Sequence, residues 1–416
     1  MNTDISVYII FAIVVILQLL LICLFGWTFI ILIKGIKAWK TRGRTIPARV
    51  SARKLHFTFI ICAHNEERVI RNPLESLAKL NYPRHLWNAY LIADNCSDKT
   101  AEIAASYPFV TILERTTREP STKGKALRWG IEELKKLGVD RDNIYIPLDA
   151  DNRVIPEFLD YMEEKFLDGA EVVNAHRVGS NPYQSLISGW YAIYWAMTMF
   201  FFCWPRHYIG YSATISGSGF GFKPSVLGEE GYCVSTITED IELAAMLNIR
   251  GIRVKYAQDA IYYDEQPTRL GQLIPQLHRW ATGGWQVLKK YTPKFLIQMK
   301  EKPSAFVYDC MVTPFMTPAI SLSVILTVLS WVLTFMHSGG ISILAFAMTV
   351  FIYAGTIVVG YAASRYSGHD PNRMIPAIIF YPIFLQIFAL ISLIAFFKPQ
   401  KVWTKIEHYG LQDEAV

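Results

Sequence analysis

The sequence predicts an α/β domain that is inserted between one N-terminal and about three C-terminal transmembrane helices. Its composition, its uncharged runs near both ends and a central alternation of strand and helix patterns support this prediction. Of the 416 residues, 52% are hydrophobic and 18% are charged, and the mean hydropathy is +0.23. Such a chain is too apolar for an ordinary soluble enzyme, too charged for a membrane bundle alone, and neither disordered nor collagen-like. The six scattered cysteines lack CxxC or zinc-site spacing, so we expect them to be reduced.

The first uncharged run, residues 5–33, predicts a transmembrane helix because it exceeds the roughly 20 residues that a helix needs to cross the hydrocarbon core. Its length, and Asp4 before it, argue against a secretory signal. The juxtamembrane segment 34–54 carries basic residues and no acid. By the positive-inside rule, we expect the chain after this span to lie in the cytoplasm. The expected location is the plasma membrane, with several spans. A nucleic-acid-binding patch is less favoured because the basic run adjoins the span, so we expect no nucleic-acid partner.

Residues 310–397 contain three further uncharged runs, which predict a transmembrane bundle of about three helices, followed by a short tail, 398–416. The joint at 337–340 is uncharged, which suits the outside, whereas the two arginines in 365–373 suit the inside. Three crossings would place the tail outside, although its lysines favour the cytoplasm. One run is therefore re-entrant or lies flat, and the sequence leaves open which one.

Residues 185–205 are also uncharged, but we predict an interfacial or core helix there and not a span. A crossing at this point would separate the acidic motifs that lie on its two sides. The rings of Trp190, Tyr191, Tyr194 and Trp195 suit a membrane interface, where aromatic side chains with a polar tip are favoured.

Short β-branched runs alternate with helical patterns across residues 55–265, which we take as one domain. The predicted strands are 57–62, 90–93, 110–113, 144–148 and 172–173, with helices over 101–106 and 126–137. Such alternation predicts a mostly parallel sheet that binds ligands at the carboxyl ends of its strands. Polar residues do follow the predicted strands, at 63–66, 94–98 and 149–151.

Asp149 and Asp151 flank one alanine directly after a predicted strand. A bend there lets the two carboxylates converge on a cation, and hard oxygen ligands are what Mg²⁺ uses beside a diphosphate, with water and phosphates completing its shell. Mg²⁺ or Mn²⁺ is therefore the expected cofactor. The alternative is a solvated turn, or an aspartate that caps the helix beginning near Pro156.

Thr238, Glu239 and Asp240 precede a helical pattern and follow a glycine-rich segment, SGSGFGF. A carboxylate placed there is suited to deprotonating an acceptor hydroxyl, which is the work of a general base. The alternative is structural, because acids favour the positive end of a helix and Thr236 and Glu239 have capping-box spacing.

Residues 266–309 predict interfacial helices, and Gln276, Arg279 and Trp280 share one face there because their spacing is i, i+3 and i+4. An arginine on such a face can neutralise a leaving diphosphate, and a tryptophan can pack against a sugar. The alternative is a membrane-surface helix with a snorkelling arginine and an anchoring tryptophan.

Two further pairs of side chains carry weaker signals. Lys123 and Lys125 have the spacing of a phosphate contact, but they also match an exposed basic turn. His64 and His278 are better explained as hydrogen-bonded structural groups than as metal ligands.

Taken in order, CAHNE, DNCSD, KGKA, DAD, TED and QLHRW, with a span before them and several after, resemble the family 2 membrane glycosyltransferases. The resemblance covers nearly the whole chain and is greatest to the processive synthases of poly-N-acetylglucosamine, chitin oligosaccharides, hyaluronan and cellulose. It implies a cytoplasmic GT-A domain, a UDP-glucose or UDP-N-acetylglucosamine donor, and a single displacement that inverts the anomeric carbon.

The resemblance also implies roles for individual residues. Those expected at the donor are Ala63, Asn65, Glu66, Asp94, Lys123, Lys125, Asp149, Gln276, Arg279 and Trp280, with Asp149 and Asp151 serving the metal. In the TED motif, Asp240 is expected to be the base, beside Glu239 and Thr238. Arg279 is expected at the diphosphate and Trp280 near the acceptor end.

Two features depart from the family pattern: Leu277 stands where a second arginine is common, and the SGSG segment differs from the forms in hyaluronan and cellulose synthases. The donor sugar and the linkage therefore stay open. A processive synthase that extends and exports a β-linked polysaccharide is the favoured hypothesis, and a transferase acting on a lipid acceptor is the alternative. A transporter or receptor fits poorly because no charge marks a path inside the uncharged runs. Oligomeric state and accessory subunits also stay open.

Overall fold

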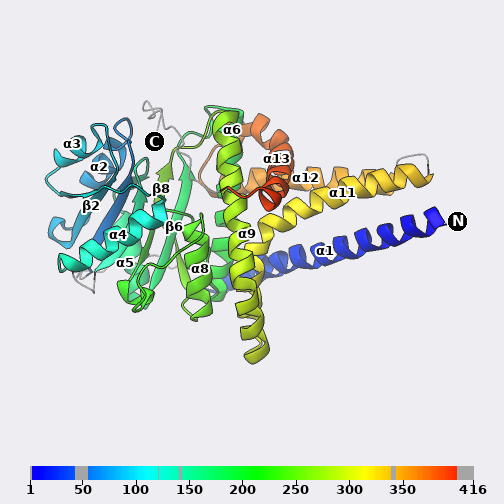
Figure 1. Cartoon of the computed structure of the whole chain (residues 1–416), viewed down its shortest axis with the longest axis horizontal. Coiled ribbons are helices and arrows are strands. Elements are labelled where there is room, and N and C mark those ends of the chain that lie inside the picture. The colour runs from blue at the N-terminus through cyan, green and yellow to red at the C-terminus, as the bar shows by residue number, and fades with distance from the viewer. Residues whose placement is uncertain (1, 43–54, 120, 140–142, 339–342, 401–416) are drawn as a thin grey trace.

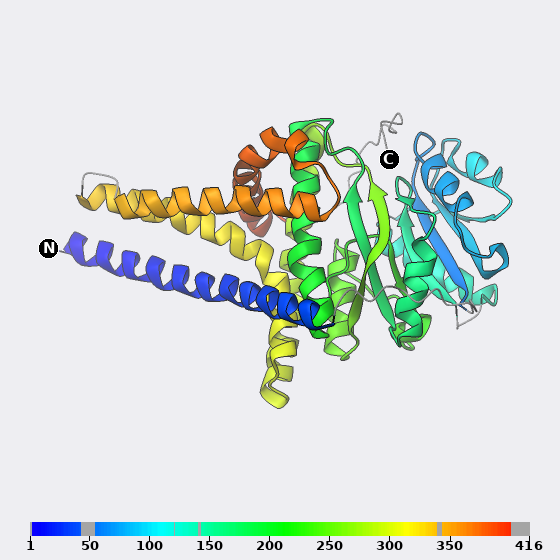
Figure 2. The ribbon, with the colours of Figure 1, turned by 180° about the vertical axis from the view of Figure 1, so that it is seen from behind.

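The computed structural model describes residues 2–42, 55–119, 121–139, 143–338 and 343–400. Most of the predicted basic segment, part of the joint at 337–340 and most of the tail therefore lie outside the described residues. An α/β part forms one end of the molecule, and helices project from the other end (Figure 1). Seen from behind, these helices extend in one direction (Figure 2); they are α1 (Asn2–Arg42), α11 (Met316–Ser338) and α12 (Ile343–Tyr366).

One eight-stranded sheet, in the order β3-β2-β1-β4-β7-β6-β8-β5, is the framework of the α/β part. The four strands β3, β2, β1 and β4 are parallel neighbours, whereas β7 is antiparallel to both β4 and β6. The sheet is therefore mixed. The strands are β1 (Phe57–Ala63), β2 (Trp87–Asp94), β3 (Val110–Arg115), β4 (Ile144–Asp149), β5 (Arg153–Val154), β6 (Val172–Gly179), β7 (Phe220–Phe222) and β8 (Val254–Asp264).

Helices cover both faces of this sheet. They are α2 (Arg71–Ala78), α3 (Thr100–Ala105), α4 (Lys123–Lys136), α5 (Phe158–Leu167) and α8 (Glu239–Ile249). Because side chains alternate along a strand, Phe57, Phe59 and Ile61 of β1 pack with α2, α3 and α5, whereas Ile60 packs with α4 and α8. All four side chains are fully buried, and each burial of this kind stabilises the fold by about 1.5–3 kcal/mol.

The five predicted strands are all present, and each is longer than predicted. Three strands were not predicted. β5 and β7 are only two and three residues long, which is too short for a periodic signal. β8 is long, but its register with β6 shifts between Ala175 and His176, and polar residues interrupt its apolar pattern.

A second group of helices lies between the sheet and the projecting helices. They are α6 (Leu186–Thr198), α7 (Trp204–Ile209), α9 (Leu270–Glu301), α10 (Ala305–Val312) and α13 (Ile375–Phe397). In Figure 1, α9 runs across the molecule at the junction. Helix α13 packs back onto α6 and α9, and Leu273, Leu277 and Phe384 lie in the apolar core that the three helices share.

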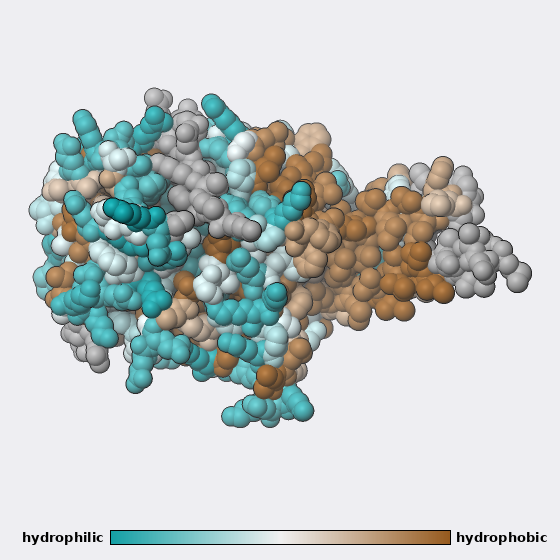
Figure 3. Space-filling view, viewed as in Figure 1, coloured by the Kyte–Doolittle hydropathy of each residue, from teal (hydrophilic) through white to brown (hydrophobic). Residues whose placement is uncertain are grey.

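Three helices of the described chain are long and apolar enough to cross a membrane: Ala12–Thr41, Leu186–Ile209 and Pro371–Phe397. The apolar stretch of α11, Ser321–Met336, is shorter. Apolar side chains cover the projecting helices, and polar side chains cover most of the α/β part (Figure 3). The predicted C-terminal runs are thus three helices, α11, α12 and α13, of which α13 meets this criterion.

The stretch Leu186–Ile209 belongs to the interior. Within this stretch, 61% of the 18-residue apolar window is buried inside the protein. The side chains of Trp190, Tyr191 and Trp195 are at most 8% exposed. These rings pack against α9 and α13, with Trp195 and Tyr191 edge-on to Trp280. Of the two predicted alternatives, the structure favours the core helix, and the expectation that these three rings meet a lipid interface is wrong because neighbouring helices cover them.

Candidate active site

A hollow of about 640 Å³ opens where the carboxyl ends of β1, β2 and β4 meet α8 and α9. Motifs that are far apart in the sequence line it together. The lining includes Ala63, Glu66, Asp94, Lys123, Asp149, Asp151, Thr238, Glu239, Asp240, Gln276, Arg279 and Trp280. Most of the predicted site residues thus share one cavity, as expected at the carboxyl edge of such a sheet.

Asp94 ends β2 and is fixed by its neighbours. Arg115 Nη1 lies 2.6 Å from Asp94 Oδ1, and the Ser121 hydroxyl donates to Asp94 Oδ2. The carboxylate is therefore held in one orientation at the end of the hollow that Ala63 and Glu66 also line.

Asn65 has a different place from the one predicted. It adopts a left-handed conformation, with φ of 57°, and its Oδ1 accepts a hydrogen bond from the Ser97 amide at 2.7 Å. It shapes the turn after β1 and is not among the residues that line the described hollow. His64 bonds to the Asp94 carbonyl at 2.6 Å and His278 to the Lys398 carbonyl at 3.0 Å, so both are hydrogen-bonded as predicted.

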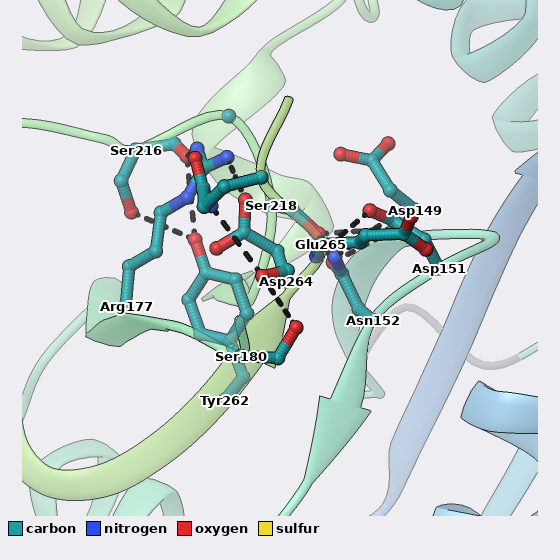
Figure 4. Close-up of polar contacts among 12 residues, drawn as sticks. Asp149, Asp151, Asn152, Arg177, Ser180, Ser216, Ser218, Tyr262, Asp264 and Glu265 are labelled. Carbon is teal, nitrogen blue, oxygen red and sulfur yellow. Dashed lines mark hydrogen bonds and ion pairs between the residues drawn. The ribbon is translucent and has the colours of Figure 1, made fainter. Parts of the chain in front are cut away.

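The turn after β4 carries Asp149 and Asp151. The Asp149 amide donates to Ser218 Oγ at 3.0 Å and to Asn152 Oδ1 at 3.1 Å, and Asp151 Oδ2 accepts from the Glu265 amide at 3.2 Å. Figure 4 shows the two aspartates at the tip of this turn, beside Glu265. The bend that lets both carboxylates reach the hollow is therefore held by a hydrogen bond within the turn and by hydrogen bonds to two other segments.

The donor set suits a hard divalent cation. Asp149 and Asp151 supply carboxylate oxygens to the same hollow, and among the described residues no cluster of three or more His, Cys, Asp or Glu is arranged to hold a metal. One or two carboxylates, with water and substrate phosphates completing the shell, are the usual protein ligands of Mg²⁺ beside a diphosphate. The residues present therefore fit Mg²⁺ or Mn²⁺.

Lys123, at the start of α4, connects the two acidic motifs. Its Nζ lies 2.5 Å from Asp149 Oδ1 and 3.9 Å from Glu239 Oε1, and it donates to the Gly217 carbonyl at 2.7 Å. Burial alone would lower the pKa of Lys123, but the two carboxylates outweigh it and the pKa is raised. Lys125 points elsewhere: its side chain is 49% exposed and lies 3.7 Å from Glu119, outside the lining of the described hollow.

Glu239 and Asp240 form the first turn of α8, with Thr238 as the N-cap residue. Burial raises the pKa of Glu239 to about 7, although Lys123 opposes the shift. Burial also raises the pKa of Asp240, against the Ile241 amide and Lys123. A carboxylate of raised basicity that faces a cavity is suited to accept a proton.

The predicted alternative, a capping box of Thr236 with Glu239, does not form. Thr236 Oγ1 donates to the Thr238 carbonyl at 3.0 Å, and Glu239 turns toward Lys123. Glu242 binds the backbone of the loop before α8, since its carboxylate accepts from the Ser235 and Thr236 amides at 2.6 Å each.

Helix α9 holds the loop before α8 in place. Lys290 Nζ lies 2.5 Å from the buried Glu242 carboxylate, and the Tyr291 hydroxyl donates to it at 3.1 Å. One turn earlier, Gln286 Oε1 accepts from the Ile237 amide at 2.9 Å. The helix that carries Gln276, Arg279 and Trp280 therefore also positions the TED motif.

The same helix explains the leucine in QLHRW. Leu277 is fully buried with Leu273 in the core against α13, so its position faces away from the hollow. Trp280 faces the hollow and stacks on Tyr194, with ring centroids 5.5 Å apart. Gln276 Oε1 is buried and has no hydrogen-bond partner within the described chain.

Arg177 and Asp264 are lining residues that no motif indicated. Arg177 lies on β6, Asp264 ends β8, and the two form an ion pair (Figure 4). The ring of Trp195 lies against the guanidinium. Arg177 is the one charged residue in the buried run VVNAHRVG. A charge inside a buried strand needs a partner, and this is the signal by which the sequence could have indicated it.

Comparison with known proteins gives the family. The model of the family described as "Glycosyltransferase like family 2" matches residues 54–283. Probable glycosyltransferase YdaM of Bacillus subtilis (strain 168) is 24% identical over 401 residues, which cover 90% of this chain and 93% of YdaM. Poly-beta-1,6-N-acetyl-D-glucosamine synthase of Staphylococcus aureus (strain COL) is 30% identical over 254 residues, 59% of this chain and 58% of that synthase.

Among solved structures, mannosyltransferase PcManGT from Pyrobaculum calidifontis, in complex with GDP-Man and Mn²⁺, is similar in fold. Its TM-score is 0.61 at 15% identity, and the match covers 94% of this chain and 99% of PcManGT. This likeness shows a GT-A-like fold. Because the family model spans more than half of the sequence, the chain belongs to glycosyltransferase family 2 and is a glycosyltransferase.

Proposed function

We propose that the protein is a membrane-bound inverting glycosyltransferase that adds a sugar from UDP-glucose or UDP-N-acetylglucosamine to the end of a growing β-linked polysaccharide. The observation that carries the proposal is the shared hollow, in which the DAD carboxylates, the TED carboxylate and the QLHRW side chains face one another. The similarity to poly-beta-1,6-N-acetyl-D-glucosamine synthase supports a polysaccharide product.

The donor would lie across the carboxyl ends of the strands. Ala63, Glu66 and Asp94 would border its uridine, and Asp149 and Asp151 would hold Mg²⁺ or Mn²⁺ at its diphosphate. When bound, the metal supplies positive charge to the leaving diphosphate. The guanidinium of Arg279 would add to this charge from the opposite side of the hollow.

Asp240 would act as the base. As the acceptor hydroxyl attacks the anomeric carbon, its O–H bond breaks and the proton passes to the Asp240 carboxylate. A new C–O bond forms at that carbon while the bond to the diphosphate oxygen breaks, and UDP leaves with the electron pair. Attack from the face opposite the leaving group inverts the anomeric configuration.

The hollow continues toward the apolar helices, which supports a polymeric acceptor. Its lining also includes Thr198 at the end of α6, Phe202 after that helix, Thr313 beside α10 and Phe388 of α13. Aromatic side chains such as these can pack against sugar faces. A growing chain that leaves the donor site past Trp280 would therefore enter the region between the helices.

We further propose the membrane arrangement. Helix α1, over 5–33, would cross the bilayer and 34–54 would lie at the cytoplasmic surface. The catalytic domain, 55–265, would be cytoplasmic, 266–309 would lie at the interface, and 310–397 would be membrane-embedded. Exposed apolar side chains on α1, α11 and α12 support this arrangement, since large apolar surfaces without protein cover mark membrane or partner contacts.

Product analysis tests the proposal. Membranes containing the protein are incubated with labelled UDP-N-acetylglucosamine or UDP-glucose and Mg²⁺ or Mn²⁺, with Asp240→Asn membranes as the matched control. The proposal expects a product that a polymer-sizing column retains. If label appeared only in material that dissolves in organic solvent, a lipid acceptor would replace the polysaccharide.

A further inference from the structure

Gly217, in the segment Ser216–Gly219, separates two charged groups that face the same space. Its φ of 85° lies in the left-handed region that favours glycine. A β-carbon added there would lie 3.5 Å from Asp240 Oδ2 and 3.6 Å from Arg177 Nη1. Outside the adjacent residues, no other described heavy atom comes within 4 Å of that point. The carboxylate and the guanidinium therefore both border one open point beside this backbone.

Arg177 is held firmly in this position. Its Nη1 donates to the Ser216 carbonyl at 2.7 Å, and its Nη2 pairs with Asp264 Oδ2. The indole of Trp195 lies against the guanidinium, whose central carbon is 3.7 Å from the ring centroid. Figure 4 shows Arg177 and Asp264 joined across the sheet, with Tyr262 and Ser216 beside them. A guanidinium has five N–H donors in a rigid fork, so these contacts do not use all the donors of Arg177.

The polar atoms that this pair leaves unused indicate a ligand. Arg177 Nε and Asp264 Oδ1 are buried, and neither has a hydrogen-bond partner in the part of the chain that the structure describes. The Asp264 side chain is only 4% exposed. Buried polar atoms without partners are uncommon in native proteins and call for a specific explanation, and a functional role at a site is one of these.

The charges indicate which kind of ligand. Asp264 compensates the charge of Arg177, and Asp240 adds a negative charge beside it. An anionic group would be repelled by these two carboxylates. A neutral group with oxygens that both donate and accept hydrogen bonds, such as a sugar hydroxyl, suits a carboxylate and a guanidinium together.

We propose that Arg177, held by Asp264, recognises the acceptor sugar by donating a hydrogen bond to the oxygen substituent next to the hydroxyl that Asp240 deprotonates. This inference rests on the proposed function. The ligand class is a neutral sugar end with two adjacent oxygen substituents. Arg177 transfers no proton; it orients the acceptor so that the attacking oxygen faces the anomeric carbon, and this orientation contributes to the rate.

Acceptor kinetics with Arg177→Lys test the proposal. A lysine keeps the charge but loses the fork, and a hydrogen bond from a charged group is worth roughly 10-fold or more in binding. The Michaelis constant for an oligosaccharide acceptor is expected to rise about 10-fold or more, whereas that for the UDP-sugar changes by less than about 2-fold. A structural defect alone would weaken both substrates together.

Acceptors from which single hydroxyls have been removed give a second readout. The wild-type enzyme is expected to use one of these deoxy acceptors about 10-fold less efficiently than the intact acceptor. With Arg177→Lys the intact and the deoxy acceptor should be used equally, because the contact is missing in both cases. If Arg177→Lys fails to bind UDP, Asp264→Asn, which frees Arg177 from its carboxylate, is put through the same comparison.

Arg206→Lys is the matched control. Arg206 also forms a buried pair with an aspartate, Asp309, and also lies near an aromatic ring, Phe202, but it is outside the described lining of the hollow. The Arg206→Lys variant should keep the wild-type preference for the intact acceptor over the deoxy acceptor. Unchanged acceptor kinetics in Arg177→Lys would overturn the inference and leave the proposed function standing. A wild-type enzyme that releases no UDP from any UDP-sugar would overturn the proposed function itself.

Discussion

Gly283 of α9 lies directly against the side chain of Thr238, so that a β-carbon at position 283 would overlap the threonine hydroxyl and methyl groups. Thr238 is the N-cap residue of the helix that presents Glu239 and Asp240. The close approach of helix and loop therefore depends on a glycine at this position. Gly271, near the start of the same helix, has open space at its β-carbon position within the described structure.

Gly283→Ala is expected to displace the TED motif. A displacement of about 1 Å can lower a rate by about 100-fold, because the base no longer meets the acceptor hydroxyl. Gly271→Ala adds the same methyl group to the same helix, away from Thr238 and outside the described lining of the hollow, and both changes raise helix propensity. Sugar transfer is measured for both variants at matched protein amounts. Equal activities would show that the contact with Thr238 is not needed.

The pH dependence of transfer should reflect the buried acids. A base must be deprotonated to work, and burial raises the pKa of Asp240 and that of Glu239, the latter to about 7. Transfer should therefore fall as the pH is lowered, along an acid limb that lies above the ordinary pKa of an aspartate. Single-turnover rates with saturating donor measure this limb.

The control for this profile is Glu239→Gln. Removing a negative charge beside Asp240 makes that aspartate easier to ionise, so the acid limb should move to lower pH. If the acid limb of the wild-type pH profile lay at pH 3.8, the ordinary pKa of an aspartate, burial would not have raised the pKa of the base.

Asp151→Ala should weaken the metal dependence of donor binding. UDP binding is measured by calorimetry with Mn²⁺ and again with EDTA. The wild-type protein is expected to bind UDP more tightly with Mn²⁺, and the variant should lose most of that gain while its binding in EDTA stays similar. Asp168→Ala, which removes an aspartate at the end of α5, serves as the comparison. An undiminished Mn²⁺ effect in Asp151→Ala would remove this residue from the metal site.

A second buried ion pair should dominate stability at the junction of α1, α7 and α10. Arg206 Nε and Nη2 each lie 2.8 Å from an oxygen of Asp309, and Trp27 Nε1 donates to the same carboxylate at 2.9 Å. Both members of the pair are 1% exposed. Arg206→Met leaves a buried carboxylate unpaired, which should cost about 3–5 kcal/mol.

Thermal unfolding in detergent measures this cost. The double variant Arg206→Met with Asp309→Leu removes both charges, so it should unfold at a higher temperature than Arg206→Met alone. If the double variant were the less stable one, the penalty for an unpaired charge would not be the cause.

Much of the fold could be predicted from the sequence because its signals are local. Phe57–Ala63 and Ile144–Asp149 are mostly apolar runs, the first followed by His64 and the second ending in Asp149, and such runs indicate buried parallel strands. Strand β7 could not be predicted in this way, since its three residues follow Gly219 and include Gly221, and it pairs antiparallel with both β4 and β6. Its place depends on tertiary contacts.

The residues of the candidate site could likewise be predicted only in part. Asp149, Asp240 and Arg279 stand in short motifs, and the structure brings them to one hollow. Lys125 and Asn65 have equally good motif positions, but the turn of α4 directs Lys125 outward and a left-handed backbone directs Asn65 to Ser97. A motif gives the spacing of residues and not the direction of their side chains.

Arg177 and Asp264 illustrate what the sequence lacks. They are separated by 87 positions and become neighbours only because β6 and β8 pair in the sheet. The pairing crosses a register shift, so no periodic pattern connects the two residues. Only the folded chain brings the guanidinium beside Asp240.

The most direct test of the account is Asp240→Asn, assayed for UDP binding and for sugar transfer on the same preparation. Asparagine keeps the shape of the side chain but cannot accept the proton from the acceptor hydroxyl. The account predicts UDP binding close to that of the wild type, with transfer reduced below detection. Transfer at the wild-type rate would contradict it, because another group would then be the base.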